Sequence, residues 1–137
     1  MKFAELLTGD WFEWNERAYI RLKDTIMSLD KHDFGTLYTP LLENREVKYI
    51  TAFDYQVKPS YAGCGNNEVS IKDAPIEVLL ERPSTGSFYA KISPYDPDDP
   101  DLVVIRTQGN DQGSLYYSRF LNAKVCIVDT IHLQNYE

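Results

Sequence analysis

Short apolar segments separated by turns are the feature that most constrains the fold of this chain. The sequence shows no sustained helical periodicity, so a long amphipathic helix is not expected. Runs of strand length, such as LVVIRT at 102–107, alternate instead with turns rich in Gly, Pro, Asn and Asp. Ten Tyr, six Phe and two Trp residues also favour strands over helices. The pattern therefore predicts an all-β protein.

A β-hairpin near the N-terminus is the first element that the sequence predicts. WFEW at 11–14 reads as one strand, Asn15-Glu16 or 15–17 as the turn and AYIRL at 18–22 as the returning strand. FAELLTGD at 3–10 has room for one or two helical turns before this hairpin. Further strands are expected at 26–29, 36–39, 47–57, 69–71, 76–80, 88–92, 102–107, 116–121 and 124–133.

Two segments of the chain resemble each other. GTLYTPLLENREV at 35–47 and GSLYYSRFLNAKV at 113–125 align without a gap, and the same offset places Ile26-Met27 on Val104-Ile105. With a gap, AYIRL at 18–22 also falls on FYAKI at 88–92. These matches support the hypothesis that the two halves are copies of one unit. The alternative is that any two antiparallel β segments with regularly spaced turns look alike.

The expected organisation is two small SH3-like or OB-like barrel units in tandem, at 1–60 and 75–137. A Gly-, Pro- and Asn-rich stretch at 61–74 is the expected linker. The alternative is a single larger β-barrel or sandwich that contains all the strands.

The first twenty or so residues resemble the start of a group of small bacterial and phage domains of unknown function. That pattern is F-x-x-L-x-x-G-D-x-F, a short turn and then Y-[IV]-[KR]-[LIV]. The matching residues here are Phe3, Leu6, Gly9, Asp10, Phe12, Tyr19, Ile20, Arg21 and Leu22. The resemblance implies an SH3-like fold and a bacterial or phage origin, and it implies no activity.

Charge and cysteine content limit the partners and the compartment. The formal net charge of −7 argues against direct nucleic-acid binding, which needs basic patches, and fits either a basic protein partner or solubility alone. No secretory signal and no membrane span are recognisable. Cys64 and Cys126 form neither a CxxC motif nor a disulfide framework, and their pairing is left open. A cytoplasmic location is the default expectation, with Cys126 as a small core residue.

No motif of catalysis, metal binding or cofactor binding is present in the sequence. The two histidines, His32 and His132, have no zinc-ligand spacing, and the glycine-rich turns match no nucleotide-binding motif. DPDDPD at 96–101 lacks the Gly turn and distal Glu of an EF-hand loop and is expected to be a solvated insertion. We therefore expect no catalytic residue, no metal, no cofactor and no enzymatic activity.

Aromatic and acidic side chains are the remaining candidates for a binding surface, because Tyr and Trp are enriched at contact sites. The candidates are Trp11, Trp14, Tyr19, Tyr89, Tyr116, Tyr117, Asp96, Asp98, Asp99 and Asp101. They favour a non-enzymatic protein-binding module, with self-association through strand edges as a further expectation. One alternative is an acidic inhibitor that mimics nucleic acid and binds a basic nucleic-acid-binding protein. Another is a small enzyme without a recognisable motif, and a third reading is that the aromatics only brace neighbouring strands.

Overall fold

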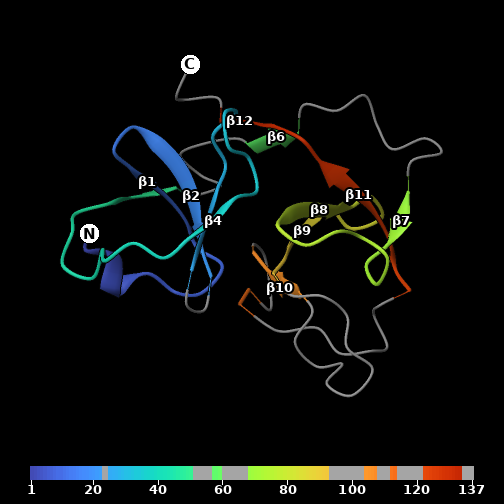
Figure 1. The fold of residues 1–137 in the computed structure, drawn as a ribbon, viewed down its shortest axis with the longest axis horizontal. Helices are drawn as coiled ribbons and strands as arrows, with labels where there is room; N and C mark the ends of the chain where they lie inside the picture. The colour runs from blue at the N-terminus through green and yellow to red at the C-terminus, as the bar shows by residue number, and fades with distance from the viewer. Residues whose placement is uncertain are drawn as a thin grey trace.

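Antiparallel β-structure dominates the computed structural model of the chain (Figure 1). The described residues are 1–22, 25–50, 57–59, 68–92, 104–107, 112–113 and 122–133. They contain one 3-10 turn, η1 (Phe3–Glu5), and no α-helix. The prediction of an all-β fold is therefore confirmed. The expected strand at 116–121 lies outside the described residues.

The first sheet has the strand order β4-β3-β2-β1-β5. Its strands are β1 (Trp11–Trp14), β2 (Arg17–Arg21), β3 (Ile26–Ser28), β4 (Leu37–Tyr38) and β5 (Lys48–Ile50). Asn15 and Glu16 join β1 to β2 with φ of 55° and 65°, which is the backbone of a tight two-residue hairpin turn. The predicted hairpin is confirmed, and Ala18 and Ile20 face the opposite side of the sheet from Tyr19, as the alternation indicates.

The second sheet has the strand order β10-β9-β8-β11-β7. Its strands are β7 (Val69–Ser70), β8 (Val78–Arg82), β9 (Ser87–Lys91), β10 (Val104–Arg106) and β11 (Lys124–Val128). A four-residue turn at 83–86 joins the hairpin strands β8 and β9, and Gly86 supplies the positive φ of 69° in that turn. β11 pairs with β8, just as β5 pairs with β1 in the first sheet.

A third, two-stranded sheet joins β6 (Val57–Pro59) to β12 (Ile131–Leu133). It lies at the top of Figure 1, between the two larger sheets. The sequence predicts one continuous strand at 124–133. In the structure the strand is interrupted at 129–130, and its two parts, β11 and β12, pair in different sheets. β12 therefore ties the end of the second half to the first half.

The expected linker at 61–74 is shorter in the structure. β7 pairs with β11, and Ile71 and Ala74 are buried against the second sheet. Residues 69–74 therefore belong to the second unit, because burying these apolar side chains stabilises the fold. Residues 60–67 lie outside the described residues.

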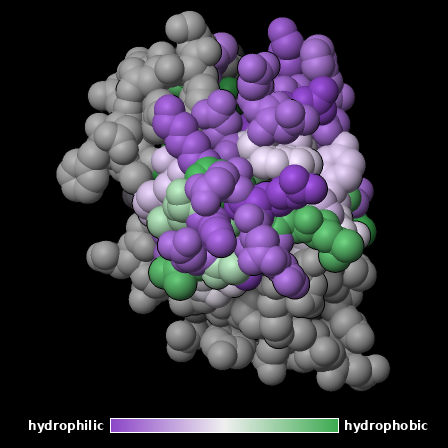
Figure 2. Space-filling model, turned by 90° about the vertical axis from the view of Figure 1, so that its left-hand side faces the viewer, coloured by the Kyte–Doolittle hydropathy of each residue, from purple (hydrophilic) through white to green (hydrophobic). Residues whose placement is uncertain are grey.

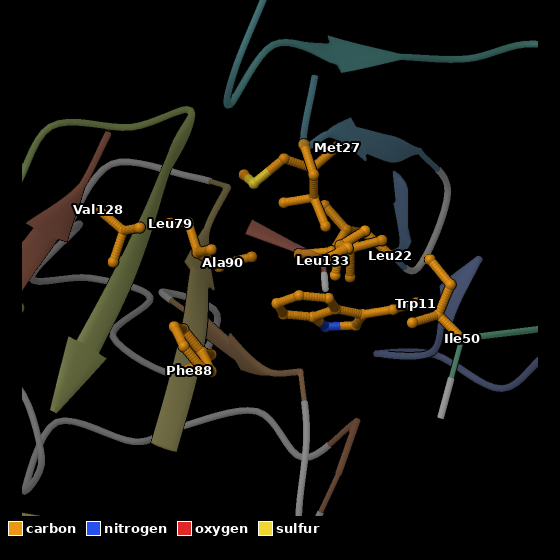
Figure 3. Close-up of a cluster of buried hydrophobic side chains, with 11 residues drawn as sticks. Trp11, Leu22, Met27, Ile50, Leu79, Phe88, Ala90, Val128 and Leu133 are labelled. Atoms are coloured by element: carbon orange, nitrogen blue, oxygen red, sulfur yellow. The ribbon is translucent and has the colours of Figure 1, made fainter. Parts of the chain in front are cut away.

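One hydrophobic cluster is shared by the two large sheets (Figure 3). Its buried members are Trp11, Ile20, Leu22, Met27, Leu29, Ile50, Leu79, Phe88, Ala90, Val128 and Leu133. Trp11 extends from the first sheet toward Phe88 of the second, with their ring centroids 5.6 Å apart in an edge-to-face arrangement. The two large sheets thus share a core. Closure of either sheet into a barrel stays a prediction.

Each sheet is also covered on its outer face. Leu6 and Leu42 cover Phe12 and Tyr19 of the first sheet, and Ile71 and Ala74 cover Leu80 and Tyr89 of the second. Both faces of each sheet are therefore apolar, which explains why strands such as β1 show aromatic side chains at consecutive positions rather than strict alternation.

Cys126 lies buried in β11 and takes part in a disulfide bond. No cysteine among the described residues is free, and Cys64, the other cysteine of the sequence, lies outside them. The expectation of a buried Cys126 is met, but the residue is more than an apolar filler because it is cross-linked.

In the parts of the chain that the structure describes, no helix has the length and apolar character needed to cross a lipid bilayer.

Candidate functional site

Two of the candidate aromatic residues are core residues and cannot form a binding surface. Trp11 is 1% exposed and Tyr89 is 3% exposed, because each points into a cluster of apolar side chains. The other six candidates outside the first sheet lie beyond the described residues: Tyr116, Tyr117, Asp96, Asp98, Asp99 and Asp101. Trp14 and Tyr19 remain on the outer face of the first sheet, where Trp14 is half-buried and Tyr19, although only 6% exposed, still lines a pocket.

Trp14 and Tyr19 line one pocket together. The pocket has a volume of about 240 Å³ and opens to solvent on the outer face of the first sheet. Its lining residues are Trp14, Arg17, Tyr19, Ile26, Asp33, Tyr38 and Pro40. The structure therefore brings three aromatic rings, one carboxylate and one guanidinium to a single hollow.

Strand pairing places most of these side chains. Trp14 of β1 lies opposite Arg17 of β2, and Tyr38 of β4 lies opposite Ile26 of β3. Directly opposite residues project on the same side of an antiparallel pair, so each pair contributes two neighbouring walls. The Trp14 and Tyr19 rings have centroids 6.2 Å apart and meet at a tilt of 49°.

Asp33 reaches the pocket from the turn between β3 and β4. The Asp33 amide donates to the Asp30 carbonyl oxygen, and the Gly35 amide donates to the Ser28 carbonyl oxygen, so the turn folds back on the end of β3. Gly35 has a φ of 86°, a backbone conformation that residues with a side chain rarely adopt. The sequence DKHDFG at 30–35 encodes this turn, and the turn aims the carboxylate at the sheet.

Two hydroxyl groups hold the Asp33 carboxylate. Ser28 Oγ donates to Oδ1 over 2.5 Å, and Tyr38 Oη donates to Oδ2 over 2.5 Å. Burial by itself would raise the pKa of Asp33, but these hydrogen bonds and the positive charge of Arg17 outweigh it and lower the pKa below its usual value of 3.8. Asp33 is therefore negatively charged at neutral pH.

Both tyrosines of the pocket keep their protons at neutral pH. The hydrogen bond to Asp33 raises the pKa of Tyr38, because ionisation would remove the donor. Burial raises the pKa of Tyr19, although the charge of Arg17 partly opposes that shift. The pocket thus presents neutral aromatic rings around one fixed negative charge.

This arrangement suits a cationic side chain. Aromatic rings attract cations to their faces, and a carboxylate adds direct charge complementarity. Arg17 is the cation that lines the pocket in this chain, and its charge acts on both Asp33 and Tyr19. Arg17 is exposed to solvent, so it can move away without disturbing the core.

Two further hollows continue from the pocket along residues 39–45. The nearer one, of about 310 Å³, shares Ile26 and Pro40 with the pocket, and the farther one, of about 420 Å³, is lined by Leu41, Glu43, Asn44 and Arg45. Leu41 lines both hollows and is 92% exposed. Figure 2, which views this end of the molecule, shows a mainly hydrophilic face with separate small hydrophobic patches. Discrete pockets, rather than one broad apolar area, therefore characterise this face.

Neither metal-ligand geometry nor comparison with known proteins assigns a function to this site. Within the described ranges, no group of three or more His, Cys, Asp or Glu side chains is placed to hold a metal ion. No protein-family model matches the chain, and neither a curated protein nor a solved structure is significantly similar to it.

Sequence patterns did not identify Arg17, Asp33 and Tyr38 as site residues. Tyr38 belongs to the repeated Gly-[ST]-Leu-Tyr motif, and Asp33 lies five residues before it in a turn. That spacing offered a signal, because a turn aspartate and a tyrosine on the following strand can share a hydrogen bond. The signal is local, however, and says nothing about Trp14, which β1 contributes to the same pocket.

Proposed function

We propose that this protein is a non-enzymatic protein-binding module whose pocket around Asp33 binds a lysine or arginine side chain of a basic partner protein. The observation that carries the proposal is the ionised Asp33 carboxylate in a hollow walled by the rings of Trp14, Tyr19 and Tyr38. The hollows along residues 39–45 give the rest of the partner segment a surface to lie on.

Arg17 is the competing cation in the free protein, because it lines the same pocket and its positive charge acts on Asp33. A partner cation would take over this charge interaction, and Arg17, which is exposed, would turn further into solvent. Interactions between exposed charges contribute little, commonly below about 1 kcal/mol, so this exchange costs little. The net charge of −7 adds long-range attraction for a basic partner.

The test is a titration of the isotope-labelled protein with short Gly/Ser peptides, followed by amide and indole NMR shifts. One peptide carries a central lysine, one an arginine, one a trimethyllysine and one a glutamine. We expect saturable shifts at the Trp14 indole with the three cationic peptides only. The indole of Trp11 is buried in the core and serves as an internal reference.

Substitutions at the pocket sharpen this test. Asp33→Asn should weaken binding of the cationic peptides by about tenfold or more, since it removes the negative charge and a hydrogen bond to a charged group is worth about 1.5–3 kcal/mol. Arg17→Gln should tighten binding, because it removes the internal competitor. Asp129→Asn, an exposed site between β11 and β12, is the matched charge control and should leave affinity within about twofold. Equal binding of the glutamine peptide, or an unchanged affinity in Asp33→Asn, would contradict the proposal.

Other expectations from the sequence have less support. The nucleic-acid-mimicking reading depends on acidic residues at 96–101, which lie outside the described residues. The disulfide at Cys126 counts against a cytoplasmic location, because stable disulfides are typical of oxidising compartments. Thiol titration of protein taken directly from its cells would decide between the compartments.

A further inference from the structure

We infer that the two large sheets are two copies of one ancestral unit and that the inner face of this unit is a self-recognition surface, whose partner is a second copy of the same unit. The chain is then a covalently fused, pseudo-two-fold dimer. The inference rests on register, on contacts outside the strands and on reciprocal contacts between the copies.

Strand register is the same in both sheets. The pair Ile20 and Met27 in β2 and β3 corresponds to Ala90 and Ile105 in β9 and β10. Every residue pair recorded between β1 and β2, β2 and β3, and β1 and β5 has such a counterpart in the second sheet. β3 and β10 differ in number by 78, and so do β5 and residues 126–128 of β11. This is the offset at which Gly35 aligns with Gly113 in the sequence.

The offset changes only at loops. It is 68 between β1 and β8 and becomes 70 after the first hairpin turn, which is two residues longer in the second unit. It becomes 78 at the next connection, residues 22–25 in the first unit and 92–103 in the second. The Asp- and Pro-rich stretch at 96–101 is therefore an insertion in one copy. Insertions confined to loops are typical of diverged copies of one fold.

Contacts outside the strands also correspond. The Phe3 amide donates to the Arg45 carbonyl oxygen over 2.9 Å, and the Ile71 amide donates to the Ala123 carbonyl oxygen over 3.1 Å. Gly9, two residues before β1, and its counterpart Glu77, directly before β8, both have a positive φ, 91° and 59°. General properties of antiparallel sheets do not require either match.

A basic side chain has the same role in both copies. Arg21 Nη1 donates to the carbonyl oxygens of Phe3 and Leu6. Lys91 Nζ, at the corresponding position of β9, donates to the carbonyl oxygens of Ile71 and Ala74, which correspond to Phe3 and Leu6. The two residue types differ, but they close the same turn onto the same strand.

The contacts between the copies are reciprocal. Gly35 of the first copy lies against the carbonyl oxygen of Glu77, just before β8. Gly113, which corresponds to Gly35, lies against the carbonyl oxygen of Thr8, just before β1. In an isologous two-fold interface, a contact between two residues is repeated between their counterparts. The two glycine contacts follow this rule to within one residue.

The face buried between the copies is the same on each. Trp11, Ile20 and Ile50 of the first copy and their counterparts, Leu79, Ala90 and Val128, all belong to the shared cluster. A single unit would expose this apolar face to water, so the unit needs a second copy to cover it.

The first test is a circular permutant of the full chain. Exchange of the copies maps the connection from Pro59 to Val69 onto a connection from position 137 to Met1. A nine-residue Gly/Ser linker, the length of residues 60–68, should therefore join Glu137 to Met1 when new termini are opened between Asn66 and Asn67. We expect cooperative unfolding within about 5 °C of the unpermuted protein. A larger loss of melting temperature with the nine-residue linker overturns the inference, even if a linker of twice that length restores folding.

The second test uses the two glycines of the interface in the unpermuted chain. Gly86→Ala is the matched control, because Gly86 also has a positive φ but nothing lies within 4 Å of the added carbon. It should lower the melting temperature by about 5 °C from backbone strain alone. Gly35→Ala and Gly113→Ala should each lower it at least about twice as far. An effect at either glycine no larger than the control overturns reciprocity.

Discussion

The two sheets share their strand register but differ on their outer faces. Trp14 and Arg17 line the pocket of the first unit, whereas the paired residues at the same register positions of the second are Arg82 and Ser87. Ser28, which holds Asp33, has Arg106 at its register position. Inner faces and backbone pairing are alike, while the outer face and the loops differ. The fold is therefore maintained by the shared interior, and binding specificity can reside on one outer face.

The largest expected effect tests whether the interior is truly common to both units. Trp11→Ala should lower the free energy of unfolding by about 3–5 kcal/mol, and Leu79→Ala at the same register position by about 2–5 kcal/mol. Both variants should unfold in one transition in urea, followed by circular dichroism, because both residues belong to one cluster. Trp14→Ala, at the half-buried pocket wall, is the control and should lose much less. Separate transitions for the two halves would break the comparison.

The next effect distinguishes the two corresponding cations, Lys91 and Arg21. Lys91 is 2% exposed and donates to three carbonyl oxygens, whereas Arg21 is half-buried. Lys91→Met should lower the free energy of unfolding by about 2–3 kcal/mol, because it leaves buried acceptors unpaired. Arg21→Met should lose about 1 kcal/mol, since water can reach the freed carbonyls. Urea denaturation of both variants measures the difference, and equal losses would show that burial does not distinguish the units.

A smaller effect concerns the turn before the first hairpin of each unit. Glu77 has a φ of 59°, where the first unit has Gly9. Glu77→Gly should raise the free energy of unfolding by about 0.5–1 kcal/mol through relief of backbone strain, and Gly9→Ala should lower it by at least about 1 kcal/mol. Thermal melts of the two variants provide the measurement. A destabilised Glu77→Gly protein would mean that the two turns are not equivalent.

The smallest effect is a pH dependence that belongs to the first unit. Asp33 has a folded pKa below its usual value of 3.8. At pH values between the folded and the unfolded pKa, the unfolded chain therefore binds more protons than the folded chain. The contribution of Asp33 to stability is complete above about pH 5 and is lost as pH falls through the folded pKa. Asp33→Asn should flatten this part of the curve of unfolding free energy against pH. A curve that keeps the wild-type slope would assign the acid sensitivity to other carboxylates.

Local patterns predicted much of the strand structure. The hairpin at 11–22 and the strands near 26–29, 36–39 and 88–92 follow from turn residues and β-branched or aromatic runs, which act over a few neighbours. The offset of 78 was also visible in the sequence, because GTLYTPLLENREV at 35–47 and GSLYYSRFLNAKV at 113–125 align at it. The break at 129–130 was not visible, since the long-range pairing of β12 with β6 determines it.

The candidate site was only half predictable for a related reason. Both faces of each sheet are covered, so alternation separates Trp11 from Phe12 but cannot say which face keeps an opening to solvent. Trp14 and Tyr19 were identified as candidate aromatic residues, but so were Trp11 and Tyr89, which point into the core and line no pocket that the structure describes. Asp33 gained its role only when Ser28 and Tyr38 came within hydrogen-bond distance.

By itself the sequence determined the all-β class, the early hairpin and the acidic character of the chain, because these depend on residue type and short spacing. Tertiary structure alone decided that two sheets bury one common core, that Cys126 is cross-linked and that one carboxylate lies among three aromatic rings. The physical reason is range: turns and strands are set by neighbours in sequence, whereas burial, cavities and the pKa of Asp33 depend on residues brought together from distant segments.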